Sequence, residues 1–225
     1  MSGRTAIVVL AKEPVPGRVK TRLCPPCDLE QAAEIAAASL ADTLLAVAAA
    51  PVGRRVLVLD GRPGWWLPAG FELLPQRGDG LDQRLATAFE DVGGPALLIG
   101  MDTPQVTPLL LASAVGALEV PGVGAVLGPA TDGGWWAAGL RGPDPGAFLG
   151  VPMSATETWA RQAERFSALG LRWVSLPRLQ DVDRFADAQA VATRVGGTPF
   201  GATVRRVAAS IGPGSGIRMT ERVPA

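Results

Sequence analysis

The sequence predicts an α/β protein in which helices cover both faces of a mostly parallel, mixed sheet, giving three layers (αβα). Short apolar runs rich in β-branched residues alternate with longer helical patterns along the chain, as in successive βαβ units. Polar loops containing glycine follow several of these runs, at the strand edge where open α/β sheets bind ligands. With 225 residues, the chain is long enough for one domain with a sizeable core.

The individual elements follow from local patterns, beginning with a buried strand over residues 5–10. Asp28 is a suitable N-cap for an alanine-rich helix that ends near Ala49. The other predicted strands are 54–59, 71–74, 96–99, 124–129, 135–140 (an antiparallel return strand) and 171–176, and the other predicted helices are 81–92, 107–118, 156–169 and 184–195. One domain is therefore expected over residues 4–195. Glycine and proline punctuate residues 196–225, which are expected to form a loosely attached tail with a short helical piece near 203–211.

The composition excludes several classes of function. The 21 Lys and Arg residues balance the 21 Asp and Glu residues, so we expect no general binding to nucleic acid or to an anionic membrane. Histidine is absent, which excludes Ser-His-Asp triads, imidazole general bases and histidine metal sites. No apolar run reaches the roughly 18 residues needed to span a bilayer, and the N-terminus lacks the apolar core of a signal peptide. A cytoplasmic protein that uses carboxylate, lysine and arginine chemistry is expected.

A basic loop, residues 11–23, directly follows the first predicted strand. It contains a glycine that lets the backbone approach a ligand closely. Its four cations are Lys12, Arg18, Lys20 and Arg22. Two interpretations stay open, a phosphate-binding loop and a solvated basic loop. The loop is not a P-loop, because Val19 stands where that pattern needs its second glycine, and no G-x-G-x-x-G follows the strand.

Three further loops are expected at the same edge of the sheet. Residues 76–85 form a glycine-containing turn that opens a helix, and a nucleobase or a phosphate could rest on its backbone. Asp102 directly follows an apolar strand, where a carboxylate can hold a divalent cation against a polyphosphate, although it can also be a turn aspartate. The turn at residues 132–134 allows close approach of a substrate, and the two tryptophans after it form either core or substrate wall. A later acidic turn at 180–183 can cap the last helix.

Four ordered motifs carry a family resemblance. They are Lys12-x-Pro14-x-Pro16-Gly17-x-Val19-Lys20-Thr21-Arg22-Leu23, Gly100-x-Asp102-x-Pro104, Gly128-Pro129-Ala130-x-Asp132-Gly133-Gly134 and Asp181-x-Asp183. Together they resemble the DUF2064 family, within the GT-A-like nucleotide-diphospho-sugar transferase superfamily, over roughly residues 4–195. The resemblance implies a GT-A-like domain. DUF2064 proteins are commonly labelled glycosyltransferases, but the Lys-Thr-Arg-Leu segment is also similar to that of guanylyltransferases acting on phospholactate or phosphoenolpyruvate.

The loops and the resemblance together assign roles to individual residues. The nucleotide-binding set is Ala11, Lys12, Pro16, Gly17, Lys20, Arg22, Gln76, Gly78, Gly80 and Leu81. The resemblance implies that Asp102 and Asp183 bind Mg²⁺ or Mn²⁺, and we expect Lys20, Arg22 and Asp132 to act in catalysis. The acceptor set is Asp132, Gly133, Gly134 and Trp135. The family's tyrosine after Asp-Gly-Gly is replaced by Trp135, and Met153 replaces the tryptophan of its Pro-Trp-Ser motif, which indicates an unusual acceptor.

The function favoured by these residues is metal-dependent transfer of a nucleotidyl group from CTP or GTP to a small phosphate- or phosphonate-type acceptor, with release of pyrophosphate. An ionised acceptor needs no strong general base, which suits a chain without histidine. A GT-A glycosyltransferase with a nucleotide-diphospho-sugar donor is the first alternative, and a non-catalytic nucleotide-binding module the second. The expected partners are a nucleotide and a small acceptor, in a monomer or a homodimer.

Overall fold

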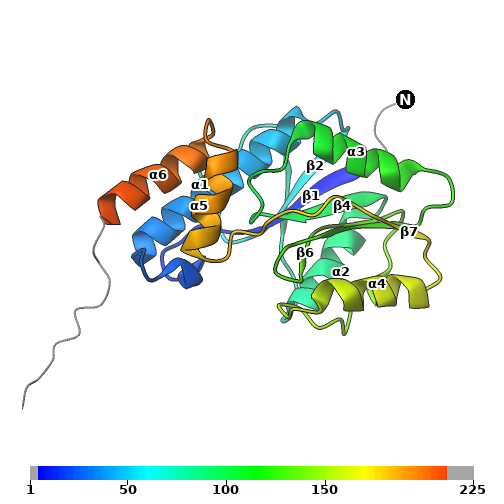
Figure 1. Ribbon diagram of the computed structural model, residues 1–225. Helices are drawn as coiled ribbons and strands as arrows, with labels where there is room; N and C mark the ends of the chain where they lie inside the picture. The colour runs from blue at the N-terminus through cyan, green and yellow to red at the C-terminus, as the bar shows by residue number, and fades with distance from the viewer. Residues whose placement is uncertain (1–4, 212–225) are drawn as a thin grey trace, which may run out of the picture.

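The computed structural model describes residues 5–211 and contains one seven-stranded sheet in the order β3-β2-β1-β4-β6-β5-β7 (Figure 1). The strands are β1 (Ala6–Lys12), β2 (Arg54–Asp60), β3 (Glu72–Pro75), β4 (Ala96–Gly100), β5 (Ala125–Pro129), β6 (Trp135–Leu140) and β7 (Trp173–Ser175). Strand β6 runs antiparallel to both β4 and β5, and every other pairing is parallel. The predicted mostly parallel, mixed sheet is therefore confirmed, including the antiparallel return strand.

Helices cover both faces of the sheet, as three layers require (Figure 1). They are α1 (Leu29–Ala49), α2 (Leu81–Val92), α3 (Pro108–Glu119), α4 (Thr158–Ala168), α5 (Phe185–Arg194) and α6 (Pro199–Ile211), with short 3₁₀ turns η1 (Thr21–Leu23) and η2 (Pro145–Ala147). Successive side chains of a strand point to opposite faces. In β1, Ile7 and Val9 pack towards α1 and α3, whereas Ala6 and Val8 pack towards α2 and α4. Strand β1 is thus buried on both faces, and the basic loop leaves the sheet from its centre.

Helix α1 begins at a capping box formed by Asp28 and Gln31. The Asp28 carboxylate accepts a hydrogen bond from the Gln31 N–H (2.7 Å), and the Gln31 side chain accepts one from the Asp28 N–H (2.9 Å). By length and composition alone α1 could span a membrane, but 78% of its most apolar window is buried inside the fold. Small alanine side chains let α1 lie close to the sheet on one side and to α5 and α6 on the other.

The expectation of a loosely attached tail from residue 196 is wrong for residues 199–211. These residues form α6, which packs with α5 against α1 and adds a third apolar cluster to the core (Figure 1). Phe200, Val204 and Val207 are each at most 1% exposed. Their i, i+4, i+7 spacing places them on one helical face, a pattern that the surrounding glycine and proline residues obscure in the sequence. The rest of the predicted tail, residues 212–225, lies outside the described residues.

Asp42 ties α6 to α1. Its buried carboxylate accepts a hydrogen bond from the Phe200 N–H (3.1 Å), in the first turn of α6. Burial raises the pKa of Asp42, and hydrogen bonds from Thr198 and Phe200 oppose that rise. We expect Asp42→Ala to lower the free energy of unfolding by about 1–2 kcal/mol, the usual cost of losing a helix N-terminal acceptor. Asp42→Asn keeps an acceptor oxygen and should change stability little. Urea unfolding measures both, and an Asp42→Ala protein as stable as the wild type would contradict this role.

Candidate active site

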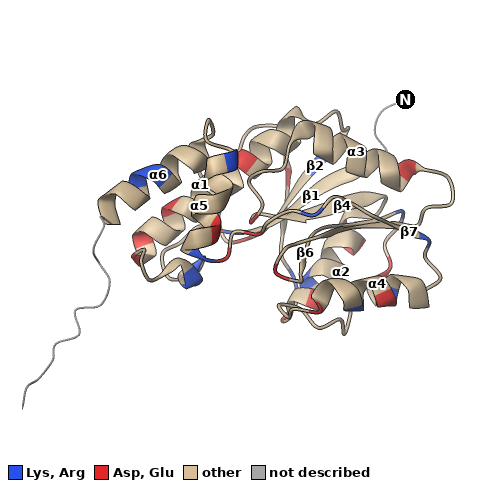
Figure 2. Ribbon diagram, in the orientation of Figure 1, with Lys and Arg blue, Asp and Glu red and all other residues tan. Residues whose placement is uncertain are grey.

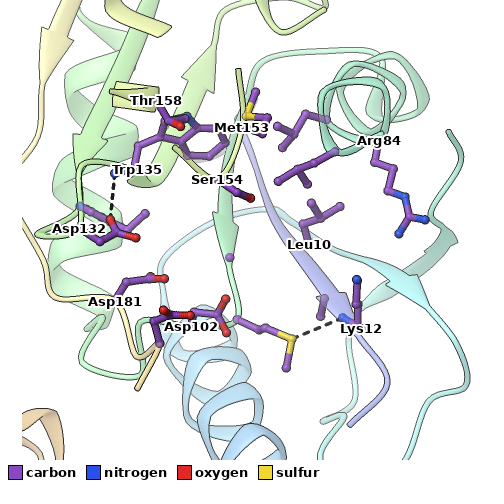
Figure 3. A pocket seen from close by; sticks show the side chains of 18 of the residues that line it. Leu10, Lys12, Arg84, Asp102, Asp132, Trp135, Met153, Ser154, Thr158 and Asp181 are labelled. Carbon is purple, nitrogen blue, oxygen red and sulfur yellow. Dashed lines mark hydrogen bonds between the residues drawn. The ribbon is translucent and has the colours of Figure 1, made fainter. Parts of the chain in front are cut away.

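A cavity of ≈ 780 Å³ opens at the carboxyl ends of β1 and β4, and its size suits a nucleotide-sized ligand. All four loops predicted to converge contribute to its lining: the basic loop, the turn before α2, the Asp102 loop and the turn before β6. Two segments join them, residues 153–158 and the acidic turn before α5. Figure 3 shows Asp102, Asp132 and Asp181 on one side of this pocket, with Lys12 and Arg84 on the opposite side.

Lys20 links the basic loop to the acidic side of the pocket. Its Nζ atom lies 2.6 Å from Asp102 Oδ1 and also donates a hydrogen bond to the carbonyl of Val182. The side chain is only 10% exposed, and its backbone is left-handed, with φ 49°. Arg22, two residues further on in η1, lies 3.1 Å from Asp183 but keeps its guanidinium exposed. Figure 2 shows residues of both charges in these loops, between the α1, α5 and α6 helices and the end of β1.

The three other cations of the pocket, Arg18, Arg84 and Lys12, differ in whether they form ion pairs. Arg18 and Arg84 both contact Asp60 at the end of β2, at 3.6 Å and 3.2 Å. Lys12 lies at the end of β1, and within residues 5–211 its ammonium group makes no ion pair. Lys12 is therefore the cation most available to an anionic ligand, while Lys20 is held in place as part of the site's framework.

A group of aspartates faces Lys20. The pKa of Asp181 is raised to about 8, first because the carboxyl group is buried and second because of the negative charge of Asp102, with Lys20 acting in the opposite direction. Neither Asp181 nor Asp183 caps α5, since the N-cap is Arg184, whose N–H donates to Asp187 (2.8 Å). The alternative interpretation of these two aspartates as helix caps is thus excluded.

Oxygen ligands of this kind suit Mg²⁺ or Mn²⁺. Beside Asp102, the hydroxyl of Thr103 is fully buried, lines the pocket and has no hydrogen-bond partner within residues 5–211. In the same part of the chain, no three or more Asp, Glu, His or Cys side chains lie close enough to hold a metal ion by themselves. The residues therefore fit a divalent cation that takes part of its coordination from a bound ligand or water, and not an all-protein cage.

Gln76 and Arg84 organise the opposite side of the pocket. The Gln76 side-chain amide donates to the carbonyls of Ala11 (2.7 Å) and Val58 (3.3 Å), and its oxygen accepts from Arg84 (3.2 Å). Arg84 also donates to the Gly78 carbonyl (3.0 Å). Beside them, the apolar floor of the pocket is formed by Leu10, Leu81, Leu85 and Leu98. Sequence reasoning missed Arg84, although its place in the first turn of a helix that opens at the ligand edge was a usable signal.

The turn at residues 132–134 forms the third wall. Asp132 Oδ1 accepts a hydrogen bond from the Gly134 N–H (2.9 Å), which closes the turn. Gly133 has φ +92°, and a Cβ atom there would lie 1.9 Å from the Thr156 carbonyl oxygen. The Gly133 carbonyl in turn accepts from the Trp159 N–H (2.9 Å). The turn and the segment before α4 are therefore locked together.

Most of the predicted site residues meet in this pocket. Those in its lining are Ala11, Lys12, Lys20, Arg22, Gln76, Leu81, Asp102, Asp132, Gly134, Trp135 and Asp183. Five do not line it: Pro16, Gly17, Gly78, Gly80 and Gly133. Pro16 and Gly17 are exposed at the bend of the basic loop, and the other three glycines shape the loops behind the wall. The lining also contains residues that the predicted catalytic, nucleotide, metal and acceptor sets left out, among them Asp79, Arg84, Ser154, Thr158 and Asp181.

A family model described as "Uncharacterized protein conserved in bacteria (DUF2064)" matches residues 32–155, more than half of the chain. The chain belongs to the DUF2064 family. The resemblance inferred from the four motifs is thereby confirmed. No curated protein matches the sequence.

Solved structures similar to this DUF2064 protein share its fold. A candidate nucleotide-diphospho-sugar transferase from Desulfovibrio desulfuricans G20 is 25% identical, with a TM-score of 0.81 over 94% of this chain and 97% of that one. A CMP:2-keto-3-deoxy-manno-octonic acid synthetase complexed with CTP is 13% identical, with a TM-score of 0.55 over 87% and 99%. A cytidylyltransferase from Leptospira borgpetersenii is 10% identical, with a TM-score of 0.54 over 96% and 99%. The last two matches show the fold alone, and together with the first they confirm the GT-A-like architecture.

Proposed function

We propose that this DUF2064 protein is a nucleotidyltransferase, which transfers the nucleotidyl group of CTP or GTP to a small acceptor and releases pyrophosphate. The observation that carries the proposal is the pocket itself, where a basic loop faces carboxylates across a ≈ 780 Å³ cavity at the carboxyl edge of the sheet. Similar folds occur in proteins described as transferring nucleotidyl groups or using nucleotide-diphospho-sugars, which supports a transferase with a nucleotide donor.

Different residues of the chain bind the phosphates and position the catalytic carboxylate. Lys12 and Arg22, both exposed at the mouth of the pocket, bind the β- and γ-phosphates and stabilise the charge that develops on the departing pyrophosphate. Lys20 holds Asp102 in position through their 2.6 Å ion pair. An acceptor oxygen attacks the α-phosphorus in line with the leaving oxygen, so that one P–O bond forms as the other breaks.

Asp102 and Asp183 are the residues that would hold a divalent cation, and the buried hydroxyl of Thr103, which follows Asp102 in the chain, lines the same pocket. When bound, Mg²⁺ or Mn²⁺ supplies positive charge that neutralises the nucleotide phosphates. The ion pairs of Asp102 with Lys20 and of Asp183 with Arg22 restrain both carboxylates.

Glycosyl transfer from a nucleotide-diphospho-sugar is the second candidate function. It is favoured by Asp132, a carboxylate in the pocket wall that is placed to accept the proton of an attacking hydroxyl group. The candidate nucleotide-diphospho-sugar transferase from D. desulfuricans, the relative with the TM-score of 0.81, supports the same reading.

A ligand panel separates these functions. Nucleoside triphosphates and nucleotide-diphospho-sugars are tested with Mg²⁺ or Mn²⁺ for thermal stabilisation, and then for release of pyrophosphate or nucleoside diphosphate with phosphorylated and neutral acceptors. We expect stabilisation by CTP or GTP and release of pyrophosphate. Stabilisation by nucleotide-diphospho-sugars alone would overturn nucleotidyl transfer. If neither class of ligand stabilises the protein, both transferase functions are refuted and a non-catalytic module is favoured.

Arg22→Ala tests the phosphate-binding part of the proposal. Removing a guanidinium that contacts the β- and γ-phosphates should weaken triphosphate binding about tenfold, the value of one charge-assisted hydrogen bond, and leave monophosphate binding nearly unchanged. Titration calorimetry with CTP, CMP, GTP and GMP measures this. Arg206→Ala is the matched control, because Arg206 is also an exposed arginine 3.1 Å from a carboxylate but lies on α6. Equal losses for triphosphate and monophosphate would show that Arg22 does not bind the terminal phosphates.

A further inference from the structure

The side of the pocket that faces away from Lys12 and Arg84 is built from two segments, residues 132–136 and 153–158 (Figure 3). Together we call them the acceptor wall. Its pocket-lining side chains are a carboxylate (Asp132), two tryptophans (Trp135 and Trp136), Met153, and the hydroxyls of Ser154, Thr156 and Thr158. Within the described chain, every lysine and arginine of the pocket lining belongs to the basic loop or to α2. The acceptor wall therefore offers hydroxyl, aromatic and acidic groups, and no cation.

Charge on this side of the pocket is unfavourable to an anion. Asp132 and Asp102 lie on it (Figure 3). The nearest cations serve other groups, because Lys20 pairs with Asp102, and Arg22, which pairs with Asp183, is assigned to the nucleotide phosphates. Arg178, which follows β7, donates its hydrogen bond to the Ala130 carbonyl (3.1 Å) and is not part of the pocket lining. The phosphate of a phosphorylated acceptor would thus lie next to carboxylates, and the acceptor wall has no lysine or arginine to neutralise it. Placing like charges side by side costs free energy.

Ser154 is held in a conformation that turns its hydroxyl into the pocket (Figure 3). Its backbone φ is +59°, in the left-handed region that a residue with a Cβ atom rarely adopts. Thr158 enforces this bend, since its Oγ1 accepts from the Ala155 N–H (3.0 Å) and lies within hydrogen-bond distance of the carbonyls of Pro152 (3.0 Å) and Ala155 (2.8 Å). The Ser154 hydroxyl itself has no hydrogen-bond partner among residues 5–211. Strain retained at a pocket wall, together with an uncommitted hydroxyl, indicates a binding role.

We propose that the acceptor of this transferase is a neutral molecule bearing hydroxyl groups, a polyol or a sugar, which Ser154 binds by a hydrogen bond. The inference rests on the proposed nucleotidyl transfer. The attacking acceptor O–H gives its proton to the carboxylate of Asp132, its oxygen forms a bond to the α-phosphorus, and the bond to the β-phosphate oxygen breaks, so pyrophosphate leaves with the electron pair. This class of acceptor differs from the phosphate- or phosphonate-type acceptor expected from the sequence, because that expectation took no account of where the pocket's cations lie.

Matched acceptor pairs test the proposal on the full-length protein. Glycerol, erythritol, ribose, glucose and mannose are each compared with their own monophosphates at fixed CTP or GTP and Mn²⁺, with pyrophosphate release as the readout. We expect kcat/KM for the neutral member of a productive pair to exceed that of its phosphorylated partner by about tenfold or more. A preference for the phosphorylated members, or no turnover of any neutral member, overturns the proposal.

The same experiment keeps this inference separate from the proposed function. Thermal stabilisation by CTP or GTP together with turnover of phosphorylated acceptors alone would support nucleotidyl transfer and refute the neutral acceptor. If no triphosphate stabilises the protein and no pyrophosphate is released with any acceptor, nucleotidyl transfer itself fails and the inference with it.

Two variants of Ser154 distinguish binding from a structural role. Ser154→Gly removes the hydroxyl but relieves the left-handed backbone, whereas Ser154→Ala removes the hydroxyl and keeps the strain. If the hydroxyl binds the acceptor, both variants raise the acceptor KM by about 3- to 10-fold and leave the nucleotide Kd unchanged, as expected for one lost hydrogen bond. If Ser154 is only structural, Ser154→Gly keeps the wild-type acceptor KM and gains thermal stability, and the binding role is refuted.

Discussion

Asp102→Asn is expected to lower turnover on the order of 10²–10³-fold, an effect typical of removing one pre-organised charged group from an active site. The substitution removes the carboxylate that we propose as a metal ligand, and it also breaks the 2.6 Å ion pair with Lys20. Nucleotide binding should then no longer respond to Mg²⁺ or Mn²⁺. Titration of CTP or GTP with and without the metal, followed by steady-state kinetics, measures both effects.

The fold should survive this change, because Asp102 lies in a loop after β4 and its side chain is 37% exposed. Glu72→Gln is the matched control, because it removes one negative charge in the same way. Glu72 lies on the edge strand β3, outside the pocket lining, and pairs with Arg54 of β2. Circular dichroism and thermal unfolding check that both variants are folded. Metal-dependent nucleotide binding that persists in Asp102→Asn would place the metal site elsewhere.

Gly133→Ala is expected to lower the free energy of unfolding by about 3 kcal/mol, the combined cost of a left-handed alanine and of an overpacked contact. A Cβ atom at this position would lie 1.9 Å from the Thr156 carbonyl oxygen, and backbone on both sides would have to shift. The shift would displace Asp132 and the segment that bears Ser154, so acceptor use should fall more than nucleotide binding.

Gly142→Ala provides the matched control, because a Cβ atom at Gly142 meets nothing within 4 Å and its backbone has no positive φ. We expect that variant to stay within about 0.5 kcal/mol of the wild type, as surface substitutions usually do. Chemical denaturation of both variants gives the comparison. A Gly133→Ala protein as stable as Gly142→Ala would show that the turn and the segment before α4 are not locked together as described.

The fold was largely predictable because the signals that set it are local. The apolar run of β1, the Asp28 cap of α1 and the antiparallel return of β6 each follow from a few neighbouring residues. Helix α6 was not predicted as part of the core, because its three buried apolar side chains are covered only by α1 and α5, and the sequence does not show that these helices pack against them.

The loops that form the candidate site were predictable from the sequence, but the ion pairs and hydrogen bonds that connect them were not. Lys20 was expected to contact phosphate, yet it is buried against Asp102 and Val182, residues far away in the sequence. The role of Arg84 depends on Asp60 and Gln76, which only the fold brings together. Ser154 is distinguished by its left-handed backbone conformation, and the residue types around it in the sequence do not predict that conformation.

A crystal structure of the protein soaked with CTP or GTP and Mn²⁺ tests the central claim most directly. We predict a triphosphate between Lys12, Arg22 and Asp102, with an anomalous manganese signal at Asp102 and Asp183 and the base above the apolar floor near Arg84. A nucleotide bound outside this cavity, or manganese bound away from Asp102, would contradict the account.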